Sequence, residues 1–141
     1  ESKLKIRAML REVTEIESIG DSCYNLARTI NHKYRGNEDF TEKQYSHIHQ
    51  MFQLTDDALN QMVSLVEDEG HQVDVNKSFN LENEINNYRS QLKNQNVLDV
   101  NNKEYDYQMG VHYMDLIGEC EKLGDYIVNV VEARTDMKEK K

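Results

Sequence analysis

The feature that most restricts the fold is a stripe of apolar and small side chains that recurs at steps of four and three residues without a break. The stripe consists of Met9, Val13, Ile16, Gly20, Cys23, Ala27, Ile30 and Tyr34. This spacing keeps one face of an α-helix apolar, so it predicts a single long helix over roughly residues 2 to 35. The chain also has no proline and only 6 glycines. That composition favours long helices over sandwiches, barrels and doubly wound sheets, which need turn residues.

Two further helices follow from the same periodicity. Gly36-Asn37 ends the first helix, and Thr41 with Gln44 has the form of a capping box that starts the second, which ends near Gly70. The expected buried face of this helix is Tyr45, Ile48, Phe52, Thr55, Leu59, Met62 and Val66. A loop is expected from Gly70 to Lys77. A third helix is expected from about Ser78 to Leu98, with Leu81, Ile85, Tyr88 and Leu92 as its buried side.

The last helix follows a second capping signal, Asn101 with Glu104, and is expected to run to about Arg134, before a frayed tail from Lys138 to Lys141. Long helices joined by short connections form up-and-down bundles. The sequence therefore predicts an all-α fold, a bundle of four long antiparallel helices in a single domain over residues 1–141. The first and last helices are expected to be antiparallel.

Charge and cysteine content exclude several classes of protein. With 26 Asp and Glu against 17 Lys and Arg, the net charge of −9 repels nucleic acid and anionic lipid surfaces and attracts cations. No apolar run approaches the roughly 20 residues of a membrane span. We therefore expect no nucleic-acid partner and no direct membrane insertion of this chain. Cys23 and Cys120 are too few for a disulfide framework, and both are expected to be buried on apolar stripes.

An internal repeat links the first and last helices. The segment from Glu15 to Asn25 matches the segment from Glu119 to Asn129 without a gap. The identical pairs are Glu15 and Glu119, Glu17 and Glu121, Gly20 and Gly124, Asp21 and Asp125, and Asn25 and Asn129. The apolar stripe is repeated too, because Val13, Ile16, Gly20, Cys23 and Ala27 align with Ile117, Cys120, Gly124, Ile127 and Val131. Packing explains the repeated apolar residues but not the repeated acids.

The repeated acids predict metal binding. Glu17 and Asp21 are four residues apart and repel each other on one helix face, as do Glu121 and Asp125. A cation between the two carboxylates would relieve this repulsion. All-oxygen ligands suit hard ions such as Mg²⁺, Mn²⁺, Ca²⁺ or iron better than Zn²⁺. Asn25 or Asn129 is expected to add a carbonyl ligand or to hydrogen-bond the ligating carboxylates.

Other interpretations of the same acids stay open. A solvated acidic face would explain them without any metal, and an acidic helical module that binds a partner protein is the main alternative function. A di-metal oxidase of the ferritin type needs Glu-x-x-His on two helices, and no Glu in the chain is followed three residues later by His. Glu82 or Glu84 could face the second acidic pair, although a surface position is the simpler expectation for both.

The doubled motif Glu-x-x-Ile/Leu-Gly-Asp-x-x-x-Asn resembles the PhoU family of helical phosphate-regulatory proteins. The resemblance implies that Glu17 and Asp21 form a first metal motif and Glu121 and Asp125 a second. It also implies that residues 2–35 are the last helix of a first three-helix repeat and that the other three helices are a complete second repeat. Ser18 and Lys122 stand where the family usually has Arg. This difference leaves the metal, which could be Mg, Mn, Fe or Zn, unidentified.

The resemblance also implies a role. PhoU-like domains occur as cytoplasmic tails of sodium-dependent phosphate cotransporters, and the chain begins without Met inside a predicted helix, as a fragment would. We therefore expect a non-catalytic regulatory domain on the cytoplasmic side of the inner membrane, with the membrane part of its parent transporter or another phosphate-uptake protein as partner. A free-standing PhoU regulator is the alternative context. Self-association into a homo-oligomer is expected if the first helix leaves an apolar face open.

Overall fold

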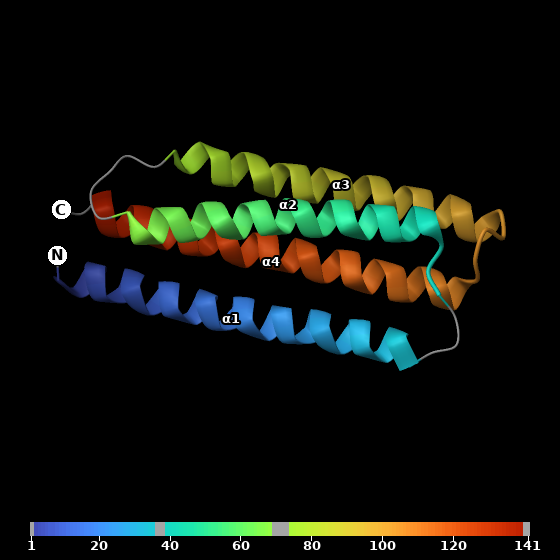
Figure 1. The fold of residues 1–141 in the computed structure, drawn as a ribbon. Coiled ribbons are helices and arrows are strands. Elements are labelled where there is room, and N and C mark those ends of the chain that lie inside the picture. The colour runs from blue at the N-terminus through green and yellow to red at the C-terminus, as the bar shows by residue number, and fades with distance from the viewer. Residues whose placement is uncertain (1, 36–38, 69–73, 140–141) are drawn as a thin grey trace.

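The computed structural model describes residues 2–35, 39–68 and 74–139, and these residues form four helices and no strand (Figure 1). The helices are α1 (Ser2–Arg35), α2 (Glu42–Glu67), α3 (Val75–Asn101) and α4 (Tyr107–Glu139). Successive helices run in opposite directions, so α1 and α4 are antiparallel. The predicted all-α bundle of four long antiparallel helices is confirmed.

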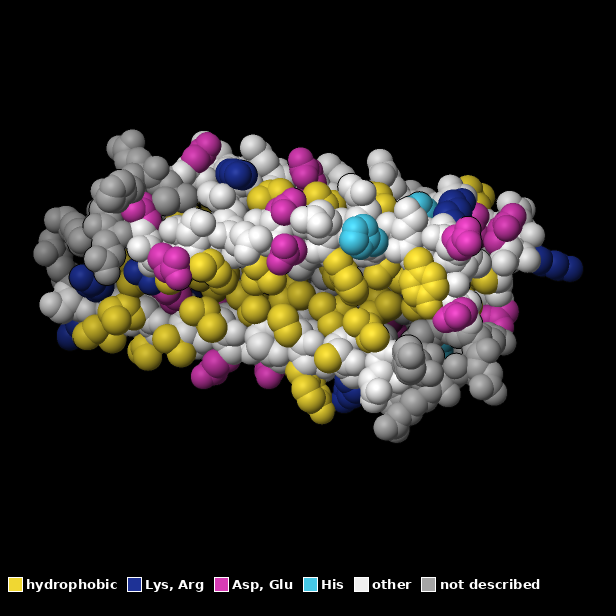
Figure 2. Space-filling view, viewed as in Figure 1, with side chains coloured by type: hydrophobic (Ala, Val, Ile, Leu, Met, Phe, Trp, Pro, Cys, Tyr) yellow, Lys and Arg dark blue, Asp and Glu magenta, His cyan; other side chains and the backbone are white. Residues whose placement is uncertain are grey.

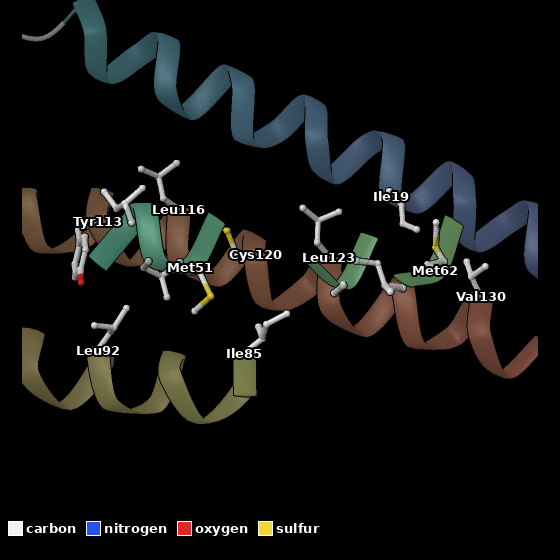
Figure 3. Close-up of a cluster of buried hydrophobic side chains, with 14 of the residues drawn as sticks. Ile19, Met51, Met62, Ile85, Leu92, Tyr113, Leu116, Cys120, Leu123 and Val130 are labelled. Atoms are coloured by element: carbon white, nitrogen blue, oxygen red, sulfur yellow. The ribbon is translucent and has the colours of Figure 1, made fainter. Parts of the chain in front are cut away.

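α4 is the central helix of the bundle. Among the described residues it lies within 8 Å, Cα to Cα, of parts of all three other helices, while α2 and α3 also contact each other. The core between α2, α3 and α4 contains large side chains with almost no exposed surface, among them Met51, Leu65, Ile85, Tyr113, Ile117, Leu123, Ile127 and Val130 (Figure 3). Burying each such side chain contributes about 1.5–3 kcal/mol to the free energy of unfolding.

Among the described residues α1 contacts α4 and no other helix, and this changes which of its faces is buried. The bounds of the helix match the prediction, but its buried residues are Ala8, Glu12, Ile19 and Ser22. Met9, Val13 and Ile16 of the predicted stripe are 50%, 54% and 43% exposed. The prediction was wrong here because the side of α4 that meets α1 carries polar groups, which small and polar side chains of α1 match better than an apolar stripe.

α2 begins as predicted. Gln44 donates its backbone N–H to Thr41 Oγ1 at 3.1 Å, and Gln44 Oε1 accepts from the Thr41 N–H at 3.0 Å, which completes the capping box. Its buried face is rotated from the predicted one, because α2 packs against both α3 and α4 and buries the side between them. The buried residues are Gln44, Ile48, Met51, Thr55, Ala58, Met62 and Leu65, whereas Tyr45 is exposed and Phe52, Leu59 and Val66 are partly buried.

The prediction that Asn101 with Glu104 starts the last helix was wrong. Asn101 is the last residue of α3 and does not start α4. The chain turns through Lys103, whose φ of 59° is left-handed, and Asp106 caps α4 by accepting the Met109 N–H at 2.8 Å. α3 begins earlier than predicted, at Val75, so the expected loop to Lys77 is shorter. The predicted helix ends at Gly36-Asn37 and Gly70 lie outside the described residues.

Two ion pairs join the first part of α1 to the last part of α4. Arg134 Nη2 lies 2.7 Å from Glu12 Oε1, and the Glu12 side chain is only 8% exposed. Arg11 Nη2 lies 2.8 Å from Asp136 Oδ2, but both of these side chains are more than 40% exposed. The two pairs therefore have nearly the same length and link the same helices, and they differ in burial.

We expect this difference in burial to decide what each pair contributes. Glu12→Ala removes a charge-assisted hydrogen bond from a buried position and should lower the free energy of unfolding by about 1–3 kcal/mol. Arg11→Ala removes a solvent-screened pair and should cost about 0–1 kcal/mol. Urea denaturation of the two variants beside the wild type measures both values. Equal losses would contradict the conclusion that the buried pair of Glu12 and Arg134 contributes more than the exposed pair.

Candidate functional site

The first acidic motif lies on the outside of α1. Glu17 and Asp21 are exposed, and neither makes a hydrogen bond or ion pair with any residue that the structure describes. A Cβ at Gly20, between them, would have no neighbour within 4 Å. Asn25 accepts a long hydrogen bond, 3.5 Å, from Arg28 Nη2. The first motif is thus an open pair of negative charges beside an uncovered helix backbone.

The second acidic motif faces α3. Glu121 Oε2 lies 3.5 Å from Arg89 Nε of α3. The Asp125 carboxylate lies near the Glu82 side chain of α3 and contributes to the raised pKa of the Glu82 carboxyl group. Glu82 is partly buried and Glu84 is exposed. The structure therefore places Glu82 beside the second motif, where the sequence had favoured a surface position.

The environment of Glu82 favours its protonated form. Burial raises the pKa of its carboxyl group, and so do the hydrogen bond with Asp125 and the negative charges of Asp125 and Glu132. A hydrogen bond with Asn86 acts in the opposite direction. Two carboxylates held this close repel each other when both are ionised, and a bound cation would relieve that repulsion as a proton does.

The two motifs do not meet in one site. Glu17 and Asp21 point away from the bundle on α1, while the carboxylates of α4 face α3. Among residues 2–35, 39–68 and 74–139, no group of three or more His, Cys, Asp or Glu side chains is gathered closely enough to hold a metal ion. The closest approach to a ligand set is Glu82 with Asp125. Glu121 is one helical turn away and bound to Arg89.

Other members of the repeat hold α1 to α4. Asn129 Nδ2 donates to Glu15 Oε2 at 3.2 Å, and Ser22 Oγ donates to Glu119 Oε2 at 2.9 Å. Asn129 thus bonds to α1 and not to the neighbouring acids of its own motif. Sequence reasoning had treated Glu15 and Glu119 only as identities of the repeat. The same residue type at both aligned positions could have indicated a shared role. The structure shows that both side chains join α1 to α4.

The two cysteines have opposite environments. Cys120 is fully buried, as predicted, and burial raises the pKa of its thiol to about 12. Cys23 is exposed on α1, which corrects the prediction that both lie in the core. The prediction failed because it placed Cys23 on the apolar stripe of α1 that the bundle leaves uncovered.

A groove of about 680 Å³ runs between α1, α3 and α4 beside the second motif. Its lining includes four cationic side chains, Arg28, Arg89, Lys93 and Lys122. Lys122 pairs with Glu119 at 3.3 Å and Arg89 with Glu121 at 3.5 Å. Arg89 therefore belongs both to the wall of this groove and to the second acidic motif, which makes it the link between them.

Comparison with known families decides the membership of the chain. The model of the PhoU domain matches residues 48–133, from the first part of α2 to the last part of α4. The chain belongs to the PhoU domain family. This family is regulatory and non-enzymatic, and its domain indicates a role in the regulation of phosphate transport. The matched span of this PhoU domain contains Glu82, Glu121 and Asp125, whereas Glu17 and Asp21 lie before it.

No curated protein and no solved structure matches the chain. None of the helices in the described part of this PhoU domain is both long and apolar enough to cross a membrane. The match to the PhoU domain confirms, at the level of the family, the resemblance inferred from the repeated motif.

The raised pKa of Glu82 predicts a pH dependence of stability. Because the pKa of Glu82 is raised above its ordinary 4.5 in the folded state, the folded chain keeps this proton at pH values where the unfolded chain has lost it. The free energy of unfolding should therefore fall as pH rises from about 4.5 through the raised value, and then stop falling. Glu82→Gln should remove this decrease, and Glu84→Gln should leave it in place.

Urea denaturation in the presence of a chelator, from about pH 4 to about pH 8, measures the decrease. The chelator keeps trace metal from replacing the proton. If Glu82→Gln and Glu84→Gln show the same slope as the wild type, the proton is not held by the pair of Glu82 and Asp125.

Proposed function

We propose that this PhoU domain is a non-catalytic regulator of phosphate transport, attached as the cytoplasmic tail to the membrane part of a sodium-dependent phosphate cotransporter at the inner membrane. Family membership supports the regulatory role. The transporter context rests on the resemblance of the doubled motif and on its setting in a helical chain. A free-standing PhoU regulator that acts on a separate phosphate-uptake protein is the alternative context for the same role.

We further propose that the domain binds a divalent metal at its second acidic motif. The observation that carries this proposal is the proximity of Glu82 to Asp125, two carboxyl groups from different helices whose interaction raises the pKa of Glu82. Their oxygens, with the amide oxygen of Asn86, suit a hard cation such as Mg²⁺ or Mn²⁺. Glu82 and Asp125 would hold the ion. Its positive charge would offset the repulsion between the two carboxylates once both are ionised.

Arg89 provides a route from metal binding to regulation. Its guanidinium now neutralises Glu121 at 3.5 Å. If Glu121 turned toward Glu82 and Asp125, Arg89 would lose its carboxylate partner and present its charge to the groove between α1, α3 and α4. The domain would then have two states, one with a protonated Glu82 and a paired Arg89, and one with a metal and an unpaired Arg89. These two states differ in the charge that Arg89 presents to the groove.

Metal binding at Glu17 and Asp21, with Asn25 and Asn129 as supporting groups, stays a prediction. Both carboxylates are exposed and four residues apart on one helix, but α1 has no neighbour on that side within the described residues to supply a third ligand. Asn129 is engaged with Glu15. The second motif is therefore the stronger site, and the first serves as an internal comparison.

Thermal melting of metal-free protein titrated with Mg²⁺, Mn²⁺, Fe²⁺ and Zn²⁺ tests the site. Binding to the folded state alone adds about 2.7 kcal/mol at a hundred times the dissociation constant. We expect this gain in the wild type and in Glu84→Gln, and its loss in Glu82→Gln and Asp125→Asn. Arg89→Gln should bind metal more tightly than the wild type, because it removes a competing positive charge from Glu121.

The same titration of Asp21→Asn separates the two motifs. If Asp21→Asn gains as much stability from the metal as the wild type does, the metal binds at the second motif. If Asp21→Asn gains none, the metal binds at the first motif. If no metal raises the melting temperature of the wild type, the metal proposal fails. The regulatory domain is then better described as a metal-free helical module that binds a partner protein, a second candidate that the exposed apolar side of α1 favours.

Phosphate uptake tests the regulatory role. The first observation to make is whether the gene encodes several apolar spans of membrane length before residue 1. If it does, we expect removal of residues 1–141 from the full protein to preserve sodium-driven uptake of labelled phosphate in membrane vesicles while abolishing its regulation. Asp125→Asn should reproduce the effect on regulation, and Glu84→Gln should not. Uptake that is unchanged in rate and regulation after the deletion would contradict the proposal.

A further inference from the structure

The groove between α1, α3 and α4 has a charge opposite to that of the chain. More of its lining side chains are cationic than acidic, whereas the chain as a whole has a net charge of −9 and shows scattered acids over much of its surface (Figure 2). The cations are Arg28, Arg89, Lys93 and Lys122, and the acids are Asp115 and Glu119. Such a local reversal of charge attracts anions to the groove, while the rest of the surface repels them.

Two of the four cations keep their charge available to a ligand. Arg89 and Lys122 are neutralised by carboxylates of α4. Lys93 is exposed and makes no hydrogen bond or ion pair with any residue that the structure describes. Arg28 forms a 3.5 Å hydrogen bond with Asn25 and likewise has no carboxylate partner in this part of the chain. An anion in the groove would therefore meet Lys93 and Arg28 without displacing another partner.

The register of α3 places Lys93 beside the middle of the groove. Arg89 Nε lies 3.5 Å from Glu121 Oε2, and Asn96 Nδ2 donates to the Gly110 carbonyl at 3.5 Å. Lys93 lies between Arg89 and Asn96 on α3. It therefore comes level with the middle of the stretch of α4 between Gly110 and Glu121.

The register of α1 places Arg28 at the same level on the opposite wall. Ser22 Oγ donates to Glu119 Oε2 at 2.9 Å, and α1 and α4 are antiparallel. Arg28 follows Ser22 by six residues, so it comes level with the part of α4 about six residues before Glu119. α1 and α3 lie on opposite sides of α4, and their described residues have no Cα atoms within 8 Å of each other (Figure 1). An anion between Lys93 and Arg28 would join two helices that otherwise meet only through α4.

Gly118 opens the floor of the groove between these two walls. It lies in the interior of α4, where glycine favours a helix less than alanine does. A Cβ at Gly118 would meet nothing within 4 Å, so no described neighbour requires a glycine there. At Gly110, by contrast, a Cβ would lie 2.9 Å from Val100 Cγ2. The space over Gly118 is thus left to the groove, and a ligand there can approach the helix backbone closely.

The end of the groove beside the first turn of α4 is apolar and aromatic. It is lined by Val97, Val100, Val111 and Tyr107, and Tyr107 is 74% exposed. An exposed aromatic ring is a surface on which a nucleotide base can stack. Tyr107 lies six to eight residues from the level of the two free cations, or roughly 9–12 Å along α4. The volume of about 680 Å³ is that of a small-molecule site.

We propose that this groove binds a nucleotide with two or more phosphoryl groups. Lys93 and Arg28 hold the phosphates from α3 and α1 over the floor at Gly118, and the base stacks on Tyr107. Asp115 also lines the groove, and its negative charge limits the affinity for an anion. Binding needs no metal at the second acidic motif. The nucleotide would add a link between α1 and α3, so its concentration would control how firmly α1 is held to the other helices.

Calorimetric titration with ADP, pyrophosphate and adenosine in the presence of a chelator tests the ligand, in residues 1–141 and in the full protein. We expect ADP to bind at least about tenfold more tightly than either of the others, because each of these occupies only one end of the groove. Lys93→Gln and Arg28→Gln should each weaken ADP binding about tenfold. Asp115→Asn should tighten it. Lys77→Gln removes the same charge from α3 outside the groove and should leave ADP binding unchanged.

Three further variants locate the two ends of the nucleotide. Tyr107→Ala should weaken ADP binding and leave pyrophosphate binding unchanged, because only the base meets the ring. Gly118→Leu fills the floor and should abolish ADP binding. Its melting temperature should not fall below that of the wild type, because the new side chain clashes with no neighbour and leucine favours a helix. Asp125→Asn should leave ADP binding unchanged, so failure of the proposed metal site does not affect this test.

Three results would overturn the proposal. Pyrophosphate that binds as tightly as ADP would show that the groove recognises phosphate alone and that the base has no site. ADP binding that Lys93→Gln and Gly118→Leu both leave intact would place the nucleotide elsewhere on the molecule. ADP binding to residues 1–141 that the full protein lacks would show that the groove is covered in the full protein.

Discussion

The packing of three helices around α4 is the constraint on which the rest of the structure depends. One broad side of α4 is aliphatic and buries residues such as Ile117, Ile127 and Val131 against α2 and α3. α1 packs on its remaining side, where Ile19 joins the apolar cluster and Glu119, Asn129 and Arg134 supply hydrogen bonds and an ion pair. Because one helix supplies both surfaces, the register of α4 fixes at once where the core lies, which face of α1 is used and where the second acidic motif points.

The polar attachment of α1 has an energetic consequence. α2, α3 and α4 are joined by complete burial of large side chains, whereas α1 contributes few core residues, of which Ile19 is the largest that is buried (Figure 3). Hydrogen bonds fix geometry but give a smaller net gain than apolar burial, because water satisfies the same groups in the unfolded chain. α1 buries one large aliphatic side chain, Ile19, against two for α3, Ile85 and Leu92, so polar contacts make up a larger part of its attachment.

The sequence was sufficient to predict the helices, but it did not predict which side chains the helices bury against one another. The bounds of α1, the capping box at Thr41 and the antiparallel order follow from local spacing and capping chemistry, which act within a few residues. The buried face of α1 does not, because its apolar stripe and its small polar stripe have the same period and only the partner helix decides between them. The contact of Glu82 with Asp125 depends likewise on the register of α3 against α4.

The repeat places the same pair of repelling acids in two environments, and the environment determines what compensates them. On α4 the pair faces a neighbouring helix, where Asp125 lies near Glu82 and raises its pKa, and where Arg89 neutralises Glu121. On α1 the pair faces solvent, and no cation of the described residues pairs with it. Duplication of one motif thus yields two different sites, because a carboxylate's partner is set by the packing around its helix and not by the motif itself.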